Sequence, residues 1–122
     1  MKDFQDLQVW AKSHALTLAV YRATGGFPKE ELYGLTSQMR RCPASIPANI
    51  AEGCGRRGNG EFHRFLQNST GSASELEYHL ILARDLAFLA QDDHASLTAQ
   101  VQEVKKMLAG LIKRVEAERT RP

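Results

Sequence analysis

The 122-residue sequence has few cysteines, no long apolar run and little net charge, and each shortage excludes a class of protein. Two cysteines are too few for a disulfide-rich secreted scaffold. No run of about 18 apolar residues is available to cross a membrane as a helix. The first ten residues are charged and lack a signal-peptide cleavage site, so we expect a cytoplasmic protein with no membrane partner. A formal net charge of +2 is too small to indicate a nucleic-acid binder by itself.

The sequence does have the composition of an ordinary folded protein. Apolar residues make up 43% of it and charged residues 25%, which is unlike a disordered segment. A chain of this length buries about two thirds of its unfolded surface around one core. We therefore expect a single domain over residues 1–122.

Apolar residues recur at three- and four-residue steps along most of the chain, which is the period of an amphipathic helix. Turn residues and prolines divide this pattern into four predicted helices, at 6–25, 30–53, 60–90 and 93–118. No segment has the pattern of a strand. Because short connections favour antiparallel neighbours, the sequence predicts an all-α, up-down-up-down four-helix bundle.

Polar residues and glycines mark the expected helix ends. Asp6, Asn59 and the pair Asp92 and Asp93 are suited to cap the first, third and fourth helices. The glycines at 25–26 should end the first helix, because positive φ costs glycine nothing.

The second predicted helix contains two prolines, Pro43 and Pro47. Each removes one backbone hydrogen bond and crowds the carbonyl four residues earlier. The sequence therefore predicts a proline-kinked or broken second helix. Asn49 and Glu52, close to this region, should tie down the disturbed backbone with hydrogen bonds.

Two of the predicted helices carry more apolar surface than one bundle core needs, which indicates contact between copies. On the first helix there are two apolar stripes, Leu7, Trp10, His14, Leu18 and Tyr21, and beside them Val9, Leu16 and Val20. On the third helix a side stripe accompanies the core seam: Tyr78, Ile81, Leu82, Asp85, Phe88 and Leu89. We therefore expect a homo-oligomer.

Arginines gather on the second and third helices and in the glycine-rich turn between them. They are Arg40, Arg41, Arg56, Arg57 and Arg64. The guanidinium groups suit phosphate, and the glycines leave backbone N–H groups free near the start of the third helix. These five arginines are the candidate nucleic-acid site. The alternative is that they pair with Glu30, Glu31, Glu52 or Glu61.

Catalytic and metal motifs are weak, and we expect no enzyme, cofactor or resident metal. A di-metal bundle needs two Glu-x-x-His pairs, whereas this chain offers only Glu75 with His79, four residues apart. Arg57 followed by His63 resembles the Arg-x(4 to 6)-His pattern of HEPN ribonucleases, which makes a metal-independent ribonuclease the enzymatic alternative. Cys42 and Cys54 are about 18 Å apart along one helix, so we expect free thiols in packing roles.

Several segments together resemble a known family. They are Phe4-Gln-Asp-Leu-Gln-Val-Trp10, Phe27-Pro28, 31–41, Ser45-Ile-Pro-Ala-Asn-Ile-Ala-Glu-Gly53, Phe65-Leu66, Gly71-Ser72 and Glu75. The chain resembles, over residues 3–115, the four-helix-bundle proteins encoded in intervening sequences of 23S ribosomal RNA genes, also called the S23 ribosomal protein family. The resemblance implies a homopentameric ring. It also implies kinship with the accessory variability determinants of diversity-generating retroelements, which bind a reverse transcriptase and nucleic acid.

The sequence therefore predicts a non-enzymatic, homo-oligomeric scaffold or adaptor. Its partner would be RNA, DNA or a nucleic-acid enzyme such as a reverse transcriptase, bound through the arginines. Besides the ribonuclease, the other alternative is a module that binds a protein partner and has no nucleic-acid role.

Overall fold

The computed structural model describes residues 3–119, and all regular elements in this range are helical. The four α-helices are α1 (Gln8–Ala23), α2 (Leu35–Cys54), α3 (Gly58–Asp85) and α4 (Gln91–Arg119). Three short 3-10 turns precede or follow them, at Phe4–Asp6, Thr24–Gly26 and Lys29–Glu31. The predicted all-α class is thus confirmed.

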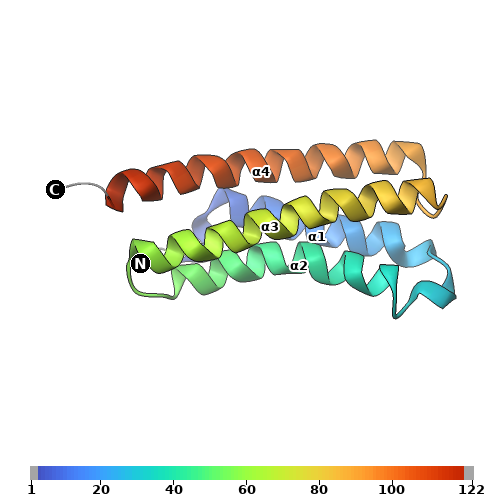
Figure 1. Cartoon of the computed structure of the whole chain (residues 1–122), viewed down its shortest axis with the longest axis horizontal. Helices are drawn as coiled ribbons and strands as arrows, with labels where there is room; N and C mark the ends of the chain where they lie inside the picture. Colours follow the sequence, from blue (N-terminus) through green and yellow to red (C-terminus); the bar gives the residue numbers. More distant parts are fainter. Residues whose placement is uncertain (1–2, 120–122) are drawn as a thin grey trace.

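Each helix packs beside two neighbours, as the ribbon in Figure 1 shows. The α2 helix contacts α1 and α3, and α4 contacts α3 and α1, so α1 and α3 lie diagonally across the bundle. Successive helices run in opposite directions, which confirms the up-down-up-down arrangement. None of the helices in the described range is long and apolar enough to span a membrane.

The core consists of one apolar seam from each helix. The seams that the three- and four-residue period indicates on α2 and α4 are buried throughout: Leu35, Met39, Cys42, Ile46 and Ile50 on α2, and Leu97, Val101, Val104, Leu108, Leu111 and Val115 on α4. The central residues of the α3 seam are also buried: Leu66, Ser69, Ala73, Leu76, Leu80 and Ala83. Small residues on α3 allow close approach to α2, where the Ser69 hydroxyl donates to the Ile46 carbonyl at 2.9 Å. The Ser69 hydroxyl is thereby paired inside the core, whereas the buried Thr36 hydroxyl has no hydrogen-bond partner among the described residues.

The two apolar stripes of α1 have different environments. Val9, Leu16 and Val20 are at most 4% exposed and form the α1 part of the core. Leu18 and Tyr21, from the other stripe, are 44% and 46% exposed. The core thus uses one stripe fully, while in the other stripe Leu7 and Trp10 pack against the core and Leu18 and Tyr21 remain on the surface.

The α2 helix continues without a break from Leu35 to Cys54, with both prolines inside it. Pro47 has no N–H group to donate to the Pro43 carbonyl, four residues earlier. That carbonyl accepts instead from the Thr17 hydroxyl of α1, at 3.1 Å. A side chain of a neighbouring helix therefore replaces the backbone hydrogen bond that Pro47 removes.

The third helix ends five residues earlier than the predicted end at Ala90. Ala87 has a positive φ of 63°, and its N–H donates to the Arg84 carbonyl at 2.9 Å. The next N–H, of Phe88, donates to the Ala83 carbonyl at 2.9 Å. These two bonds form a Schellman motif, which ends the helix with alanine in the place where glycine is usual. The absence of glycine explains the wrong prediction.

Other predicted ends also need correction. The first helix begins after Leu7 rather than at Asp6, and the only side-chain cap nearby is Asp3, which accepts from the Gln5 N–H at 2.9 Å. The glycines at 25–26 lie in a 3-10 turn without positive φ. The second helix begins at Leu35, not at residue 30, because a 3-10 turn occupies residues 29–31.

The last two helices, α3 and α4, also begin at residues other than those predicted. The N-cap of α3 is Arg57, so Asn59 lies inside the first turn and donates to Glu118 of α4 at 3.1 Å. Asp92 and Asp93 also lie in the first turn of α4, where the helix dipole stabilises a negative charge. The cap predictions for α3 and α4 were therefore wrong, because Asn59, Asp92 and Asp93 lie within the first turns of these helices rather than before them.

Two glycines shape the turn between α2 and α3. A Cβ atom on Gly53 would lie 2.9 Å from both Phe62 Cδ1 and Phe65 Cβ, so only glycine lets α3 pack this closely. Gly58 has a φ of +79°, a conformation that favours glycine. The local sequence therefore fixes the angle at which α3 leaves α2.

Candidate functional site

Three of the five candidate arginines gather at the α2–α3 turn, which we call the basic end (Arg56, Arg57 and Arg64). The Arg56 and Arg64 guanidinium carbons lie 5.3 and 4.5 Å from the centre of the Phe65 ring. The ring is almost buried, so it offers both arginines a fixed surface on which to stack. Phe65 is a positioning residue, a role that its place among the family-like segments of the sequence did not indicate.

Acidic partners neutralise part of the basic end. Arg56 pairs with Glu52 at 3.1 Å and Arg64 pairs with Glu61 at 3.0 Å. These are two of the glutamates that the sequence offered as alternative partners for the arginines. All four side chains are about half exposed, and such surface pairs contribute at most about 1 kcal/mol each. Arg57 is exposed, and within residues 3–119 its side chain makes no ion pair or hydrogen bond.

Arg40 and Arg41 do not join the other three arginines. Arg40 Nε donates to the Thr24 hydroxyl at 2.9 Å, and its guanidinium lies 4.8 Å from the centre of the Tyr21 ring. Arg56 lies beyond the end of α2 at Cys54, and the helix between Arg40 and Cys54 alone rises by about 21 Å. Arg40 therefore fixes the connection between α1 and α2, at the opposite end of the bundle, and the five arginines do not form one surface.

The histidine of the ribonuclease alternative contacts α4. His63 Nε2 lies 2.8 Å from Glu116 Oε2, and the His63 side chain is only 13% exposed. Arg57 lies in the exposed turn before α3. The structure thus gives His63 an acidic partner from another helix rather than a contact with Arg57.

Asn49 has the backbone contact expected of it, whereas Glu52 contacts a side chain instead of the backbone. The Asn49 amide donates to the Ser45 carbonyl at 2.7 Å, one turn earlier in the proline-containing helix. Glu52 pairs with Arg56 in the following turn.

Both cysteines are free and buried. Burial, and secondarily the charge of Glu75, raises the pKa of the Cys42 thiol to about 12. Burial and the Asp3 carboxylate also raise the pKa of Cys54. Cys42 accordingly keeps its proton, which it donates to the Ser72 carbonyl at 3.0 Å.

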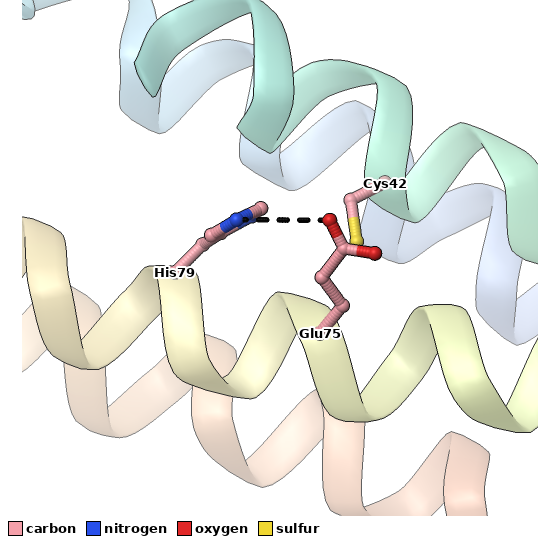
Figure 2. Close-up of side chains that lie close together, drawn as sticks. All are labelled: Cys42, Glu75 and His79. Carbon is pink, nitrogen blue, oxygen red and sulfur yellow. Dashed lines mark ion pairs between the residues drawn. The ribbon is translucent and has the colours of Figure 1, made fainter. Parts of the chain in front are cut away.

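Cys42 lies beside the Glu75 and His79 side chains, and we call these three residues the Cys-Glu-His cluster (Figure 2). One ligand atom from each residue lies within 4.8 Å of the others. Glu75 and His79 are one turn apart on α3, whereas Cys42 comes from α2. Sequence reasoning found the α3 pair and missed the cysteine, because only the packing of α2 on α3 brings it there.

The end of the bundle opposite the basic end is rich in exposed apolar side chains. Within residues 3–119, all of the large apolar side chains classed as exposed belong to the C-terminal halves of α1 and α3 or to the segments that follow these helices. We call this region the apolar half, and it consists of Leu18, Tyr21, Leu32, Tyr33, Tyr78, Ile81 and Leu86. Tyr33, in the α1–α2 connection, is 94% exposed.

Comparison with known proteins agrees with this architecture. A solved structure from Bacteroides thetaiotaomicron, described as a protein of unknown function from the S23 ribosomal protein family, superimposes with a TM-score of 0.77. The two chains are 24% identical, and the match covers 86% of this chain and 98% of the other. Among curated proteins, none matches at a significant level. The family model described as 23S rRNA-intervening sequence protein matches residues 5–110, and the chain belongs to that family.

Proposed function

We propose that this protein is a non-enzymatic scaffold that self-associates through its apolar half. The observation that carries the proposal is the concentration of exposed apolar side chains on α1, α3 and the segments after them. A solvent-exposed apolar region of this kind is typical of a protein–protein interface. Four of these side chains, Leu18, Tyr21, Tyr78 and Ile81, belong to the stripes for which the sequence predicted a partner outside the bundle, whereas Leu89 of the α3 stripe is buried in the core.

The exposed apolar stripe of α1 and the side stripe of α3 lie where they favour a head-to-tail contact between copies. Because α1 and α3 lie diagonally, Leu18 of α1 and Ile81 of α3 belong to different faces of the bundle. A contact between one face of a copy and another face of the next copy is heterologous, and it closes into a ring when the rotation allows. The proposed assembly is the homopentameric ring that the family resemblance implies.

Two charge variants test the assembly. Leu18→Glu and Ile81→Glu each place a charge on one face, at positions 44% and 42% exposed, so the fold should tolerate them. Sedimentation velocity should show an oligomer for the unmodified protein and for the surface control Gln102→Glu, and a monomer for each variant. A 1:1 mixture of the two variants should form a heterodimer, because one intact contact remains.

The mixture distinguishes a ring from a symmetric dimer. If the contact joined the same face on two copies, at least one variant would still dimerise alone, and mixing would not restore a contact. An unmodified protein that stays monomeric at its highest soluble concentration contradicts the scaffold proposal as a whole.

We further propose that the basic end binds the phosphates of a nucleic acid. Arg57 supports this, since it is exposed and unpaired in the described range and lies at the start of α3. The Glu partners of Arg56 and Arg64 are half exposed, so a phosphate can compete with them. Cyclic symmetry would place the basic ends of all copies on one rim of a ring, which multiplies a modest charge.

A salt titration tests the nucleic-acid interface. Fluorescence anisotropy with a labelled single-stranded RNA and a DNA duplex should show binding that weakens as salt rises. Arg57→Ala should reduce the slope of log affinity against log salt by about 1 for each phosphate that this side chain neutralises in the complex. Arg22→Ala removes the same charge from the apolar half and should leave the slope unchanged. Absence of binding at low salt removes this interface and leaves the scaffold proposal intact.

The same RNA provides the test of the non-enzymatic assignment. We expect it to stay intact during prolonged incubation at high protein concentration. Cleavage that disappears in His63→Ala would instead establish the ribonuclease alternative.

A nucleic-acid enzyme is the second partner class we propose for the adaptor, and the reverse transcriptase implied by the family resemblance belongs to it. Co-purification that survives nuclease treatment would indicate a direct protein contact.

A further inference from the structure

The Cys-Glu-His cluster has the arrangement of a preformed metal site on rigid elements. Figure 2 shows the Glu75 carboxylate facing the His79 ring with the Cys42 sulfur next to the carboxylate, with α2 on one side and α3 on the other. His79 Nε2 lies 3.7 Å from Glu75 Oε2. All three ligand atoms lie within 4.8 Å of one another, so small side-chain movements would bring them around one ion.

The donor set indicates the class of metal. A thiolate, an imidazole and a carboxylate together suit a borderline-soft ion such as Zn²⁺, whereas Mg²⁺ and Ca²⁺ prefer oxygen ligands alone. Zinc–ligand distances of about 2.0 to 2.3 Å place neighbouring ligand atoms of a tetrahedron about 3.3 to 3.7 Å apart. For a nitrogen and an oxygen ligand this separation is about 3.3 to 3.5 Å, and the 3.7 Å between Glu75 Oε2 and His79 Nε2 is close to it.

The histidine has no hydrogen bond that would explain its burial. The His79 side chain is 12% exposed, and Nδ1 is buried without a hydrogen-bond partner among the described residues. Nε2, at 3.7 Å from the carboxylate oxygen, is beyond hydrogen-bond distance. Buried polar groups in folded proteins are normally paired with protein, water or an ion. A cation between Nε2 and the carboxylate would give Nε2 a bond that it lacks in this structure, while Nδ1 would keep the ring proton.

Binding a cation would change the ionisation of Cys42. Without one, burial and the negative charge of Glu75 keep the thiol protonated, with a pKa of about 12. A divalent cation reverses this, because it stabilises a thiolate and a carboxylate side by side. Binding would release the Cys42 proton to solvent and replace the hydrogen bond to the Ser72 carbonyl.

We propose that Cys42, Glu75 and His79 bind one Zn²⁺-class cation between α2 and α3. The fourth coordination position would be open to water, since the Glu75 side chain is 56% exposed and gives the site access to solvent. All three ligands come from one chain, so the site does not depend on self-association.

Cobalt substitution tests the site directly. Protein purified with a chelator, then freed of it, is titrated with Co²⁺ and observed by absorption spectroscopy. We expect a thiolate-to-cobalt charge-transfer band in the near ultraviolet and intense visible bands typical of a tetrahedral site. Both should saturate at one Co²⁺ per chain and disappear when Zn²⁺ is added.

Matched variants assign the ligands. Cys42→Ser and His79→Gln should remove the charge-transfer band or weaken affinity by about a hundredfold or more, beyond the effect of losing an outer-shell group. Cys54→Ser and His94→Gln change the same residue types elsewhere and should leave the titration unchanged. Circular dichroism establishes that each variant is folded.

Two results would overturn the proposal. One is the absence of a charge-transfer band in the folded, unmodified protein, and the other is a band that persists in Cys42→Ser. Leu18→Glu and Ile81→Glu should retain the site, so failure of the oligomer and failure of the metal site are separate outcomes.

Discussion

The hydroxyl of Thr17 on α1 donates to the carbonyl oxygen of Pro43 on α2 at 3.1 Å, inside the core. That carbonyl has no helical partner, because residue 47 is a proline. The hydroxyl also lies 2.9 Å from the Ser13 carbonyl on its own helix, so its single proton is shared between two acceptors. A residue of α1 thus compensates for a proline of α2, which couples the two helices at this point.

Replacing Thr17 with valine should destabilise the protein by about 1 to 3 kcal/mol, because the Pro43 carbonyl is then buried without a partner. Valine keeps the shape of threonine, so the change isolates the hydroxyl. Urea denaturation at a fixed protein concentration measures the free energy of unfolding.

The Pro47→Ala background supplies the control for this prediction. Alanine restores an N–H group four residues after Pro43, so the carbonyl no longer depends on Thr17. The destabilisation caused by Thr17→Val should therefore be smaller in this background. Equal effects in both backgrounds would show that the hydroxyl does not compensate for the proline.

Gly53→Ala should destabilise the fold by about 1 to 2 kcal/mol, the net of overpacking against α3 and the better helix propensity of alanine. The added methyl group would lie 2.9 Å from atoms of both Phe62 and Phe65. Gly110→Ala is the matched control, because nothing lies within 4 Å of its Cβ position. It should instead stabilise α4 by about 1 kcal/mol. The thermal midpoints of the two variants should move in opposite directions.

Periodicity predicted the seams of α2 and α4 correctly because burial on one face of a long helix repeats over many turns. Leu97 to Val115 is an example, since every third or fourth residue there is buried. The same reasoning could not decide which apolar stripe of α1 enters the core. Leu16 and Leu18 are equally apolar, and only the position of α2 and α4 determines that Leu18 is exposed.

Helix ends were predicted less well, because competing backbone conformations differ by little free energy. Asp6 and Asn59 are good caps by residue type, yet the chain begins its helices one residue later and two residues earlier than those positions imply. The grouping of the candidate site residues was hard to predict for another reason. Arg40 and Arg56 are near in sequence but lie toward opposite ends of α2, while Cys42 and His79 are distant in sequence and adjacent in space.

Ala87→Gly should stabilise the protein by about 0.5 to 1 kcal/mol. Glycine removes the cost of the left-handed conformation in the folded state, and this gain exceeds the loss that comes from the higher entropy of the unfolded chain. Ala87 has a φ of 63° and is exposed, so the change removes no buried packing. Ala90→Gly is the control, since its φ is not positive and the change should be neutral or destabilising. If denaturation midpoints fall in both variants, the Schellman end of α3 is not strained.

Alkaline pH should destabilise the protein partly through Cys42. Its pKa in the folded state is about 12, raised by burial and by Glu75 from a value of 9.0. A raised folded-state pKa means that the unfolded chain loses this proton first. The contribution to stability is therefore complete below about pH 9 and is lost as pH rises from there toward 12.

Cys42→Ala removes this titration and leaves those of lysine and tyrosine in place. Measured with a chelator present, the unfolding free energy of the unmodified protein should fall more steeply above pH 9 than that of the variant. Thiol labelling at neutral pH should likewise be slow until denaturant is added, because both cysteines are buried and protonated. Parallel pH profiles for the two proteins, or rapid labelling of the folded protein, would mean that Cys42 is not held protonated by the core.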